Sequence, residues 1–177
     1  DSIFLIFRIN TADPIQAWKD HFEKLEKFKI YLNEKQFAKL YYKGENTDLT
    51  VDLPKNHIWQ GGCEHTSKGL VFAANIPTEE VFCMPYKYGV NGVLSSTMPL
   101  EYNGNIIDNF KFYFENGKIV SFEAEKGYAT LENLLSSDEA SRYLGEVAIV
   151  PVSSPIYKTG LIFYNTLYDE NASCHFA

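Results

Sequence analysis

The sequence is poor in cysteine and in basic residues, and it has no long apolar run. Its three cysteines, Cys63, Cys83 and Cys174, lie far apart and form no C-x-x-C pair, so neither a disulfide framework nor a thiolate zinc site is indicated. A reducing, cytoplasmic environment is expected. Sixteen Lys and Arg residues stand against 23 Asp and Glu, which argues against electrostatic binding of nucleic acid or an anionic membrane. No run of about 18 apolar residues could cross a bilayer.

What the sequence does contain is enough apolar material for a core. Of its 177 residues, 45% are hydrophobic and 15% are aromatic, which suits one domain, or one domain that carries a piece of another. With nucleic acid and membrane disfavoured, small molecules, peptides and metal ions are the better candidate ligands.

The first clear element is a helix that starts at Asp13. Asp13 followed by Pro14 is typical of an N-cap and a first helical turn, whereas residues 1–9 suit either a buried strand or the end of a helix. Apolar residues then recur at steps of three and four, which predicts an amphipathic helix of about five turns. These residues are Ile15, Trp18, Phe22, Leu25, Phe28 and Leu32.

After this helix the pattern changes to short strands. The Asn116-Gly117 pair predicts a tight hairpin, because both residues tolerate positive φ angles. A broken helical pair is expected over residues 130–143, and a terminal helix is expected from Asp169. The expected strands cover residues 37–43, 49–53, 70–74, 93–100, 110–114, 119–122, 146–152 and 161–164. The sequence therefore predicts an α+β fold with a mostly antiparallel, barrel-like sheet core, an N-terminal amphipathic helix and a terminal helix.

Two acid-bearing stretches border apolar strands. In N-I-P-T-E-E-V-F, residues 75–82, the side chains of Glu79 and Glu80 point to opposite faces of an extended backbone, so only one can easily face a given cavity. Taken alone, the stretch is better explained by two solvated loop glutamates. In L-G-E-V-A-I-V-P, residues 144–151, Glu146 is either at the exposed lip of a strand or paired, because an unpaired buried carboxylate is costly.

The third stretch is L-Y-D-E-N-A-S-C-H-F-A, residues 167–177. On a regular helix Glu170 and His175 are about 140° apart and share no face, so they could share a metal only if Glu170 precedes the helix. The purely structural alternative is that Asp169, Glu170 and Asn171 cap a helix and that His175 packs against apolar neighbours with its ring nitrogen hydrogen bonded. Cys174 next to His175 is poor geometry for a thiol nucleophile and its base.

Taken together, the three stretches closely resemble motifs of the thermophilic aminopeptidase family of metallopeptidases. The resemblance covers essentially the whole chain, since D-P-I-Q-A-W-K-D-H, G-E-N-T-D-L-T-V-D-L-P and S-S-T-M-P-L-E-Y-N-G-N-I-I-D-N-F also look like family sequence in family order. It implies an enzyme that removes N-terminal residues from peptides with a free N-terminus.

The resemblance also implies a metal site. The matching motif positions are Glu80, Glu146, Glu170 and His175, a set rich in oxygen that suits two divalent ions such as zinc, cobalt or manganese. Glu146 is expected to bridge the ions, which lie about 4 Å apart in such sites and activate a shared water. Glu79 is the candidate for a carboxylate that assists proton transfer.

The chain departs from the family pattern in its extent. Family members continue on both sides, with an N-terminal α/β domain before this segment and a tyrosine, a histidine and an aspartate of the site after it. Residues 1–36 are therefore expected to be a helical segment linked to that domain, and residues 37–177 a truncated catalytic domain. We expect a fragment with little activity alone, taken from a homodimeric protein. His21, His57 and His65 lie outside the motifs, and structural or surface roles are expected for them.

Two other classes of protein remain open from the residues alone. A non-catalytic, sheet-rich binding or assembly module would carry the acids as surface charge. A cysteine hydrolase would use Cys174, but the sequence offers it no independent base and no oxyanion motif, so this class ranks last.

Overall fold

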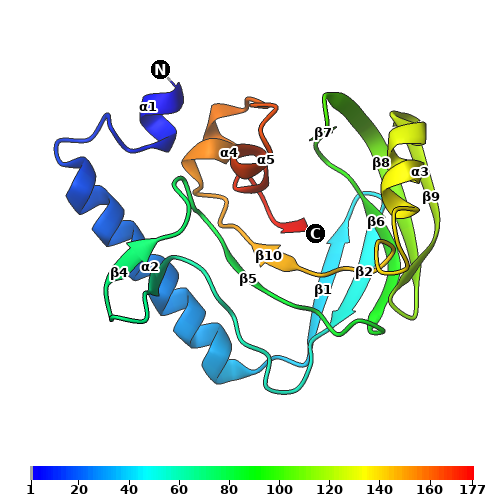
Figure 1. Cartoon of the computed structure of the whole chain (residues 1–177), viewed down its shortest axis with the longest axis horizontal. Coiled ribbons are helices and arrows are strands. Elements are labelled where there is room, and N and C mark those ends of the chain that lie inside the picture. The colour runs from blue at the N-terminus through cyan, green and yellow to red at the C-terminus, as the bar shows by residue number, and fades with distance from the viewer. Residues whose placement is uncertain (1) are drawn as a thin grey trace. The chain divides into compact units, whose positions relative to one another are not determined.

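The structure is a computed structural model that describes residues 2–177 (Figure 1). These residues cluster into two compact units. The first unit contains the chain up to residue 36 together with residues 57–83 and 147–176, and the second contains residues 37–56, 84–146 and 177. The fold is mixed, with helices and mostly antiparallel sheets, which confirms the predicted α+β class.

The long helix of the first unit is α2 (Pro14–Lys35), and it confirms the predicted amphipathic helix. The Asp13 side chain caps it by accepting a hydrogen bond of 3.0 Å from the Gln16 N–H. Its buried positions are Leu25 and Leu32. The shorter helices of this unit are α1 (Ser2–Ile6), α4 (Pro155–Thr159) and α5 (Thr166–Glu170). No helix in the described part of the chain is both long and apolar enough to span a membrane.

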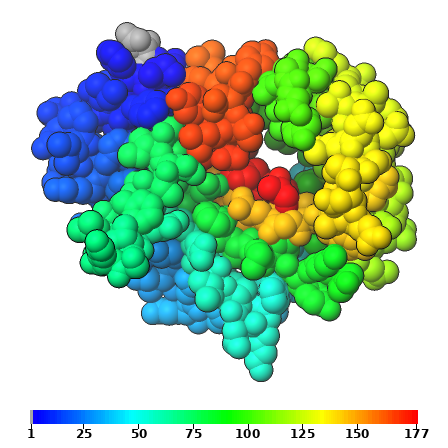
Figure 2. All heavy atoms as spheres, in the orientation of Figure 1, coloured from blue at the N-terminus to red at the C-terminus, as the bar shows by residue number. Residues whose placement is uncertain are grey.

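The sheet that matters for the site is small and lies in the first unit. It consists of β5 (Val81–Cys83), β10 (Val147–Ile149) and β11 (His175–Phe176), with β10 paired to the other two in antiparallel fashion. In Figure 2 the red residues at the end of the chain lie directly against the orange segment that contains β10. A separate hairpin is formed by β3 (Cys63–His65) and β4 (Val71–Ala73).

The second unit is built on a larger antiparallel sheet. Its strands are β1 (Lys39–Gly44), β2 (Thr47–Asp52), β6 (Val90–Ser95), β7 (Leu100–Tyr102), β8 (Asn105–Glu115) and β9 (Lys118–Lys126). The order is β1-β2-β6-β8-β7, with β9 also paired to β8. Helix α3 (Tyr128–Leu135) packs on β8 and β9 (Figure 1). Within residues 2–177 the strand order does not return to its start, so the sheet is open rather than a closed barrel.

The hairpin between β8 and β9 is the one that Asn116-Gly117 predicts. Both residues have positive φ, 48° at Asn116 and 83° at Gly117. A Cβ at Gly117 would lie 1.8 Å from the Lys87 carbonyl oxygen. Glycine is therefore needed here both for its backbone angle and for the close approach of the neighbouring chain.

The end of the chain differs from the sequence prediction. Helix α5 begins at Thr166, where the Asn165 side chain caps its N-terminus, and it ends at Glu170; residues 161–164 form no strand. The Asp169 carboxylate accepts the N–H groups of Phe163 and Asn165 at 2.8 and 3.1 Å, so it belongs to this turn and does not open a later helix. The chain then reaches β11, so His175 lies on a strand.

Candidate metal centre

One face of the three-stranded sheet gathers the predicted ligands. The buried Ala148 of β10 is paired with His175 of β11 and with Phe82 of β5. Opposite residues of an antiparallel pair share a face, as do residues two apart on one strand. Glu146 and Glu80, each two residues from a member of this row, therefore lie on the same face as His175.

The ladder between β10 and β11 continues by one residue to reach Glu146. The Glu146 N–H donates to the Ala177 carbonyl at 2.9 Å, and the Ala177 N–H donates to the Glu146 carbonyl at 3.3 Å. These bonds extend the register in which Val147 is paired with Phe176. The backbone of Glu146 is thus held by the strand that carries His175.

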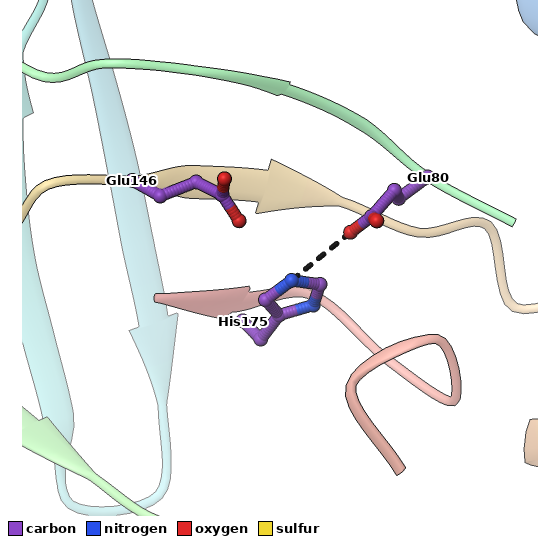
Figure 3. A group of neighbouring side chains, drawn as sticks. All are labelled: Glu80, Glu146 and His175. Atoms are coloured by element: carbon purple, nitrogen blue, oxygen red, sulfur yellow. Dashed lines mark ion pairs between the residues drawn. The ribbon is translucent and has the colours of Figure 1, made fainter. Parts of the chain in front are cut away.

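The three side chains point toward one another (Figure 3). One ligand atom each from Glu80, Glu146 and His175 can be chosen so that all lie within 4.8 Å of one another. The shortest contact joins His175 Nε2 to Glu80 Oε2 at 3.0 Å, and the two side chains are 16% and 11% exposed. Two carboxylates and an imidazole this close form a compact donor set with little solvent to screen it.

The orientation of the His175 ring shows that the cluster needs a positive charge. Its Nδ1 lies 3.1 Å from the Ser173 carbonyl oxygen, which can only accept, so Nδ1 carries the hydrogen. In the neutral ring Nε2 then presents a lone pair to Glu80 Oε2, which is also an acceptor. Within residues 2–177, no hydrogen-bond donor satisfies that buried oxygen. A proton or a cation must therefore lie between the two atoms.

The ligand atoms of Glu80, Glu146 and His175 suit a divalent metal ion. A ligating histidine usually donates its other ring N–H to a backbone carbonyl, which is the arrangement that His175 makes with Ser173. The carboxylates of Glu80 and Glu146 would repel each other without a cation. Oxygen and imidazole ligands suit zinc, cobalt and manganese.

Glu170 is placed differently from these three residues. It is the last residue of α5 and is not a member of the group that Glu80, Glu146 and His175 form. The helical spacing of about 140° does not apply to it and His175, because His175 lies on β11. The Cys174 Sγ contacts the Val150 carbonyl oxygen at 3.7 Å.

Glu79 faces the interior. Only 1% of the residue is exposed, and its two oxygens lie 2.7 and 3.0 Å from Arg8 Nη2. Burial raises the pKa of Glu79 to about 7, although the Arg8 guanidinium opposes the shift. The two neighbouring glutamates thus point in opposite directions, and the role of Glu79 in proton transfer stays a prediction.

Asn171 joins two of the motifs. It is 0% exposed, and its Oδ1 accepts the Glu79 N–H at 2.7 Å. Its Nδ2 donates to the Leu167 carbonyl at 2.9 Å, and its own carbonyl accepts the Ser154 hydroxyl at 2.9 Å. Neither Asn171 nor Arg8 was singled out from the sequence for this role. The sequence feature that could have identified Arg8 is its position as the single arginine of an apolar run, because a buried arginine needs a partner.

His21 completes the surroundings of Glu79 and has the structural role expected for it. Its Nε2 lies 2.7 Å from the Thr78 carbonyl and 3.4 Å from Glu79 Oε2. Burial lowers the pKa of His21 from 6.5 to about 4, and the charge of Arg8 acts in the same direction. At neutral pH the ring is therefore neutral and donates to the Thr78 carbonyl.

This shift predicts a pH-dependent stability. Between pH 4 and 6.5 the unfolded chain protonates His21 and the folded chain does not, so its contribution is full above pH 6.5 and is lost as the pH falls toward 4. The free energy of unfolding of wild type relative to His21→Gln should rise by up to about 3 kcal/mol across that range. Urea denaturation of the full-length protein at several pH values measures it.

A matched variant tests the assignment. The raised pKa of Glu79 acts in the opposite sense, reducing stability as the pH rises from 4.5 to about 7. Glu79 is present in both proteins, so the difference between them reports His21 together with its 3.4 Å contact with Glu79. His65→Gln changes an exposed histidine of β3 and should leave the pH profile unaltered. Equal profiles for wild type and His21→Gln would contradict the assignment.

Comparison with known proteins gives a consistent set of matches. Residues 1–177 match the protein family described as thermophilic metalloprotease (M29). The chain is 51% identical to Aminopeptidase 2 of Geobacillus stearothermophilus and 52% identical to Aminopeptidase AmpS of Bacillus subtilis (strain 168), over 100% of the chain and 43% of each relative. A solved structure, wild-type AmpT from Thermus thermophilus, superposes with a TM-score of 0.93 at 44% identity, over 99% of this chain and 43% of that one. The chain therefore spans less than half the length of these relatives.

Proposed function

The chain belongs to the thermophilic metalloprotease family (M29), and from this premise we propose that it is part of a metal-dependent aminopeptidase. The substrates are peptides with a free N-terminus, from which the enzyme removes the first residue. The names of the relatives, all aminopeptidases, support this activity. The observation that carries the proposal is the convergence of Glu80, Glu146 and His175, where His175 Nε2 and Glu80 Oε2 lie 3.0 Å apart in a position that a metal ion could occupy.

The ligands proposed are Glu80, Glu146 and His175, with Glu170 as a further ligand from α5. Glu146 is proposed to bridge two divalent ions of zinc, cobalt or manganese. When bound, such ions polarise the peptide carbonyl and lower the pKa of water. The protein holds the ligands in place through the Ser173 carbonyl, which orients the His175 ring, and through the β10–β11 ladder, which fixes the Glu146 backbone.

The extent of the chain shapes the rest of the proposal. Since it covers 43% of its relatives, we propose that it supplies part of the metal site and has little activity alone. We retain the division expected from the sequence, with residues 1–36 as a linking helical segment and residues 37–177 as part of the catalytic domain. A homodimer is proposed for the full-length protein. Cys63, Cys83 and Cys174 are not joined by disulfides, which supports the proposed cytoplasmic location.

Metal removal tests this function. The full-length protein is assayed for hydrolysis of leucine p-nitroanilide before and after dialysis against a chelator, and again after addition of zinc, cobalt or manganese. We expect activity to disappear on dialysis and to return with a divalent ion, because the proposed ligands Glu80, Glu146 and His175 would hold the ion that activates water. Activity that is indifferent to the chelator but lost on alkylation with iodoacetamide would instead favour a cysteine hydrolase. A metal-free, inactive protein would favour a binding module.

A further inference from the structure

We propose that Arg8 is a positioning residue for the metal ligand Glu80, and that it acts through the neighbouring Glu79. This inference rests on the proposed function, because it concerns one ligand of that site. It assigns a role to a charged residue that lies between α1 and α2 in the chain, outside the ligand motifs.

Arg8 is itself held firmly. Its guanidinium carbon lies 4.2 Å from the centre of the Trp18 ring, a cation–π contact, and its side chain is 14% exposed. The Trp18 Nε1–H donates to the Phe7 carbonyl at 3.0 Å, which ties the ring to the segment that carries Arg8. From this position Nη2 reaches both Glu79 oxygens, at 2.7 and 3.0 Å.

The backbone beside Glu79 is held as well. The Thr78 carbonyl lies 2.7 Å from His21 Nε2, and the Glu79 N–H donates to Asn171 Oδ1 at 2.7 Å. Both contacts lie at the peptide between Thr78 and Glu79. The Glu79 side chain adds a third attachment, through its two contacts with the Arg8 guanidinium.

These attachments determine where Glu80 points. Side chains alternate along an extended backbone, so fixing Glu79 toward the interior directs Glu80 to the opposite face, toward His175 (Figure 3). Without Arg8 the buried Glu79 carboxylate loses its counter-charge, and an uncompensated buried charge is strongly unfavourable. Either the segment that carries Glu79 then moves toward solvent, or the Glu79 carboxylate takes up a proton. In either case the hold on the peptide that carries Glu80 weakens.

The test uses cobalt binding by the full-length protein. We compare wild type, Arg8→Met, Arg8→Lys and a control, Lys39→Met, which removes a cation from the more exposed Lys39–Asp52 ion pair of 2.8 Å in the second unit. Co²⁺ affinity is measured by competition with a chelator, and ligand geometry by the cobalt d–d absorption bands. Hydrogen-bond partners of ligands typically contribute 10- to 100-fold in metal affinity.

The expected result is a loss of about 10-fold or more in Co²⁺ affinity for Arg8→Met, with altered d–d bands. Arg8→Lys should recover part of the affinity because it restores the charge, and Lys39→Met should match wild type. Wild-type affinity and bands in Arg8→Met overturn the proposal, even if the variant is less stable. Failure of wild type itself to bind cobalt overturns the proposed function and this inference with it.

A second variant covers poor folding of Arg8→Met. The double variant Arg8→Met/Glu79→Met removes both buried charges and keeps apolar side chains of similar length, which relieves the cost of an unpaired charge. If Glu79 anchors the segment, the double variant still binds cobalt more weakly than wild type. Recovery of wild-type affinity and bands in the double variant overturns the positioning role.

Discussion

Replacing Glu146 with glutamine in the full-length protein is expected to remove bound metal and to reduce leucine p-nitroanilide hydrolysis to background. Glutamine keeps the size of the side chain but loses the negative charge that draws a cation into the group with Glu80 and His175. Removing a hydrogen-bond partner of a metal ligand typically lowers metal affinity by roughly 10- to 100-fold. Removing a proposed bridging ligand itself should lower the affinity by more than that. Metal content by mass spectrometry and the rate of hydrolysis give the two readouts.

A matched variant makes that result interpretable. Glu132→Gln makes the same chemical change on the exposed face of α3, and it should keep the metal and the rate of wild type. If Glu146→Gln behaved like Glu132→Gln, Glu146 would not be a metal ligand. The bridging role would then have to be abandoned.

Replacing Gly61 with alanine is expected to destabilise the protein and to disturb the site together. Gly61 has φ of 131°, and a Cβ there would lie 2.5 Å from the backbone carbonyl oxygen of Glu80 and 3.1 Å from the Val81 Cα. Residues other than glycine rarely adopt such a φ angle. The new Cβ would also clash with main-chain atoms of Glu80 and Val81, which cannot easily move away. We expect a loss of at least about 2 kcal/mol in the free energy of unfolding.

The same substitution should weaken Co²⁺ binding, because relief of the clash shifts the backbone of a proposed ligand. Gly61 adjoins Gln60, whose N–H and carbonyl are hydrogen bonded to Phe82 at 2.8 and 3.0 Å. Gly69→Ala is the control, since Gly69 also has a positive φ, of 79°, but no atom lies within 4 Å of its Cβ position. Equal effects of the two variants on cobalt affinity would show that close packing against Glu80 is unimportant.

The elements that could be predicted from the sequence are those with local signals. Asp13 and Pro14 mark the start of α2, and the Asp13 side chain does cap it. Asn116-Gly117 marks the β8–β9 turn, where both residues have the positive φ that the turn needs. In each case a few neighbouring residues decide the conformation, because the capping bond or the turn geometry is made within the segment itself.

The end of the chain could not be predicted in the same way. The sequence pattern predicted a helix from Asp169 onward. In the structure His175 instead lies in β11, because it pairs with Ala148 of β10. The Asn165 cap starts α5 before Asp169, and the Asp169 side chain accepts the Phe163 N–H at the start of that helix. Short segments follow their tertiary partners rather than their own propensity, and nothing local shows that Ala148 will lie opposite His175.

The candidate site shows the same limit. The motif resemblance named Glu80, Glu146 and His175, which the structure brings together. The alternation of side chains predicted that only one of Glu79 and Glu80 would easily face a given cavity. The residues that surround Glu79 could not be predicted from the sequence, because the Arg8–Glu79 pair joins residues 71 apart in the chain. A lone arginine in an apolar run indicates a buried partner without saying which residue it is.

The bond between the Glu79 N–H and Asn171 Oδ1 closes a loop of 92 residues. At about 5–20 residues per second on the ribosome, Asn171 is synthesised roughly 5–18 s after Glu79. Contacts of such high contact order also form late, since the entropy of loop closure must be overcome before they are made. The segment that carries Glu80 therefore gains its final support only when its distant partner has been translated.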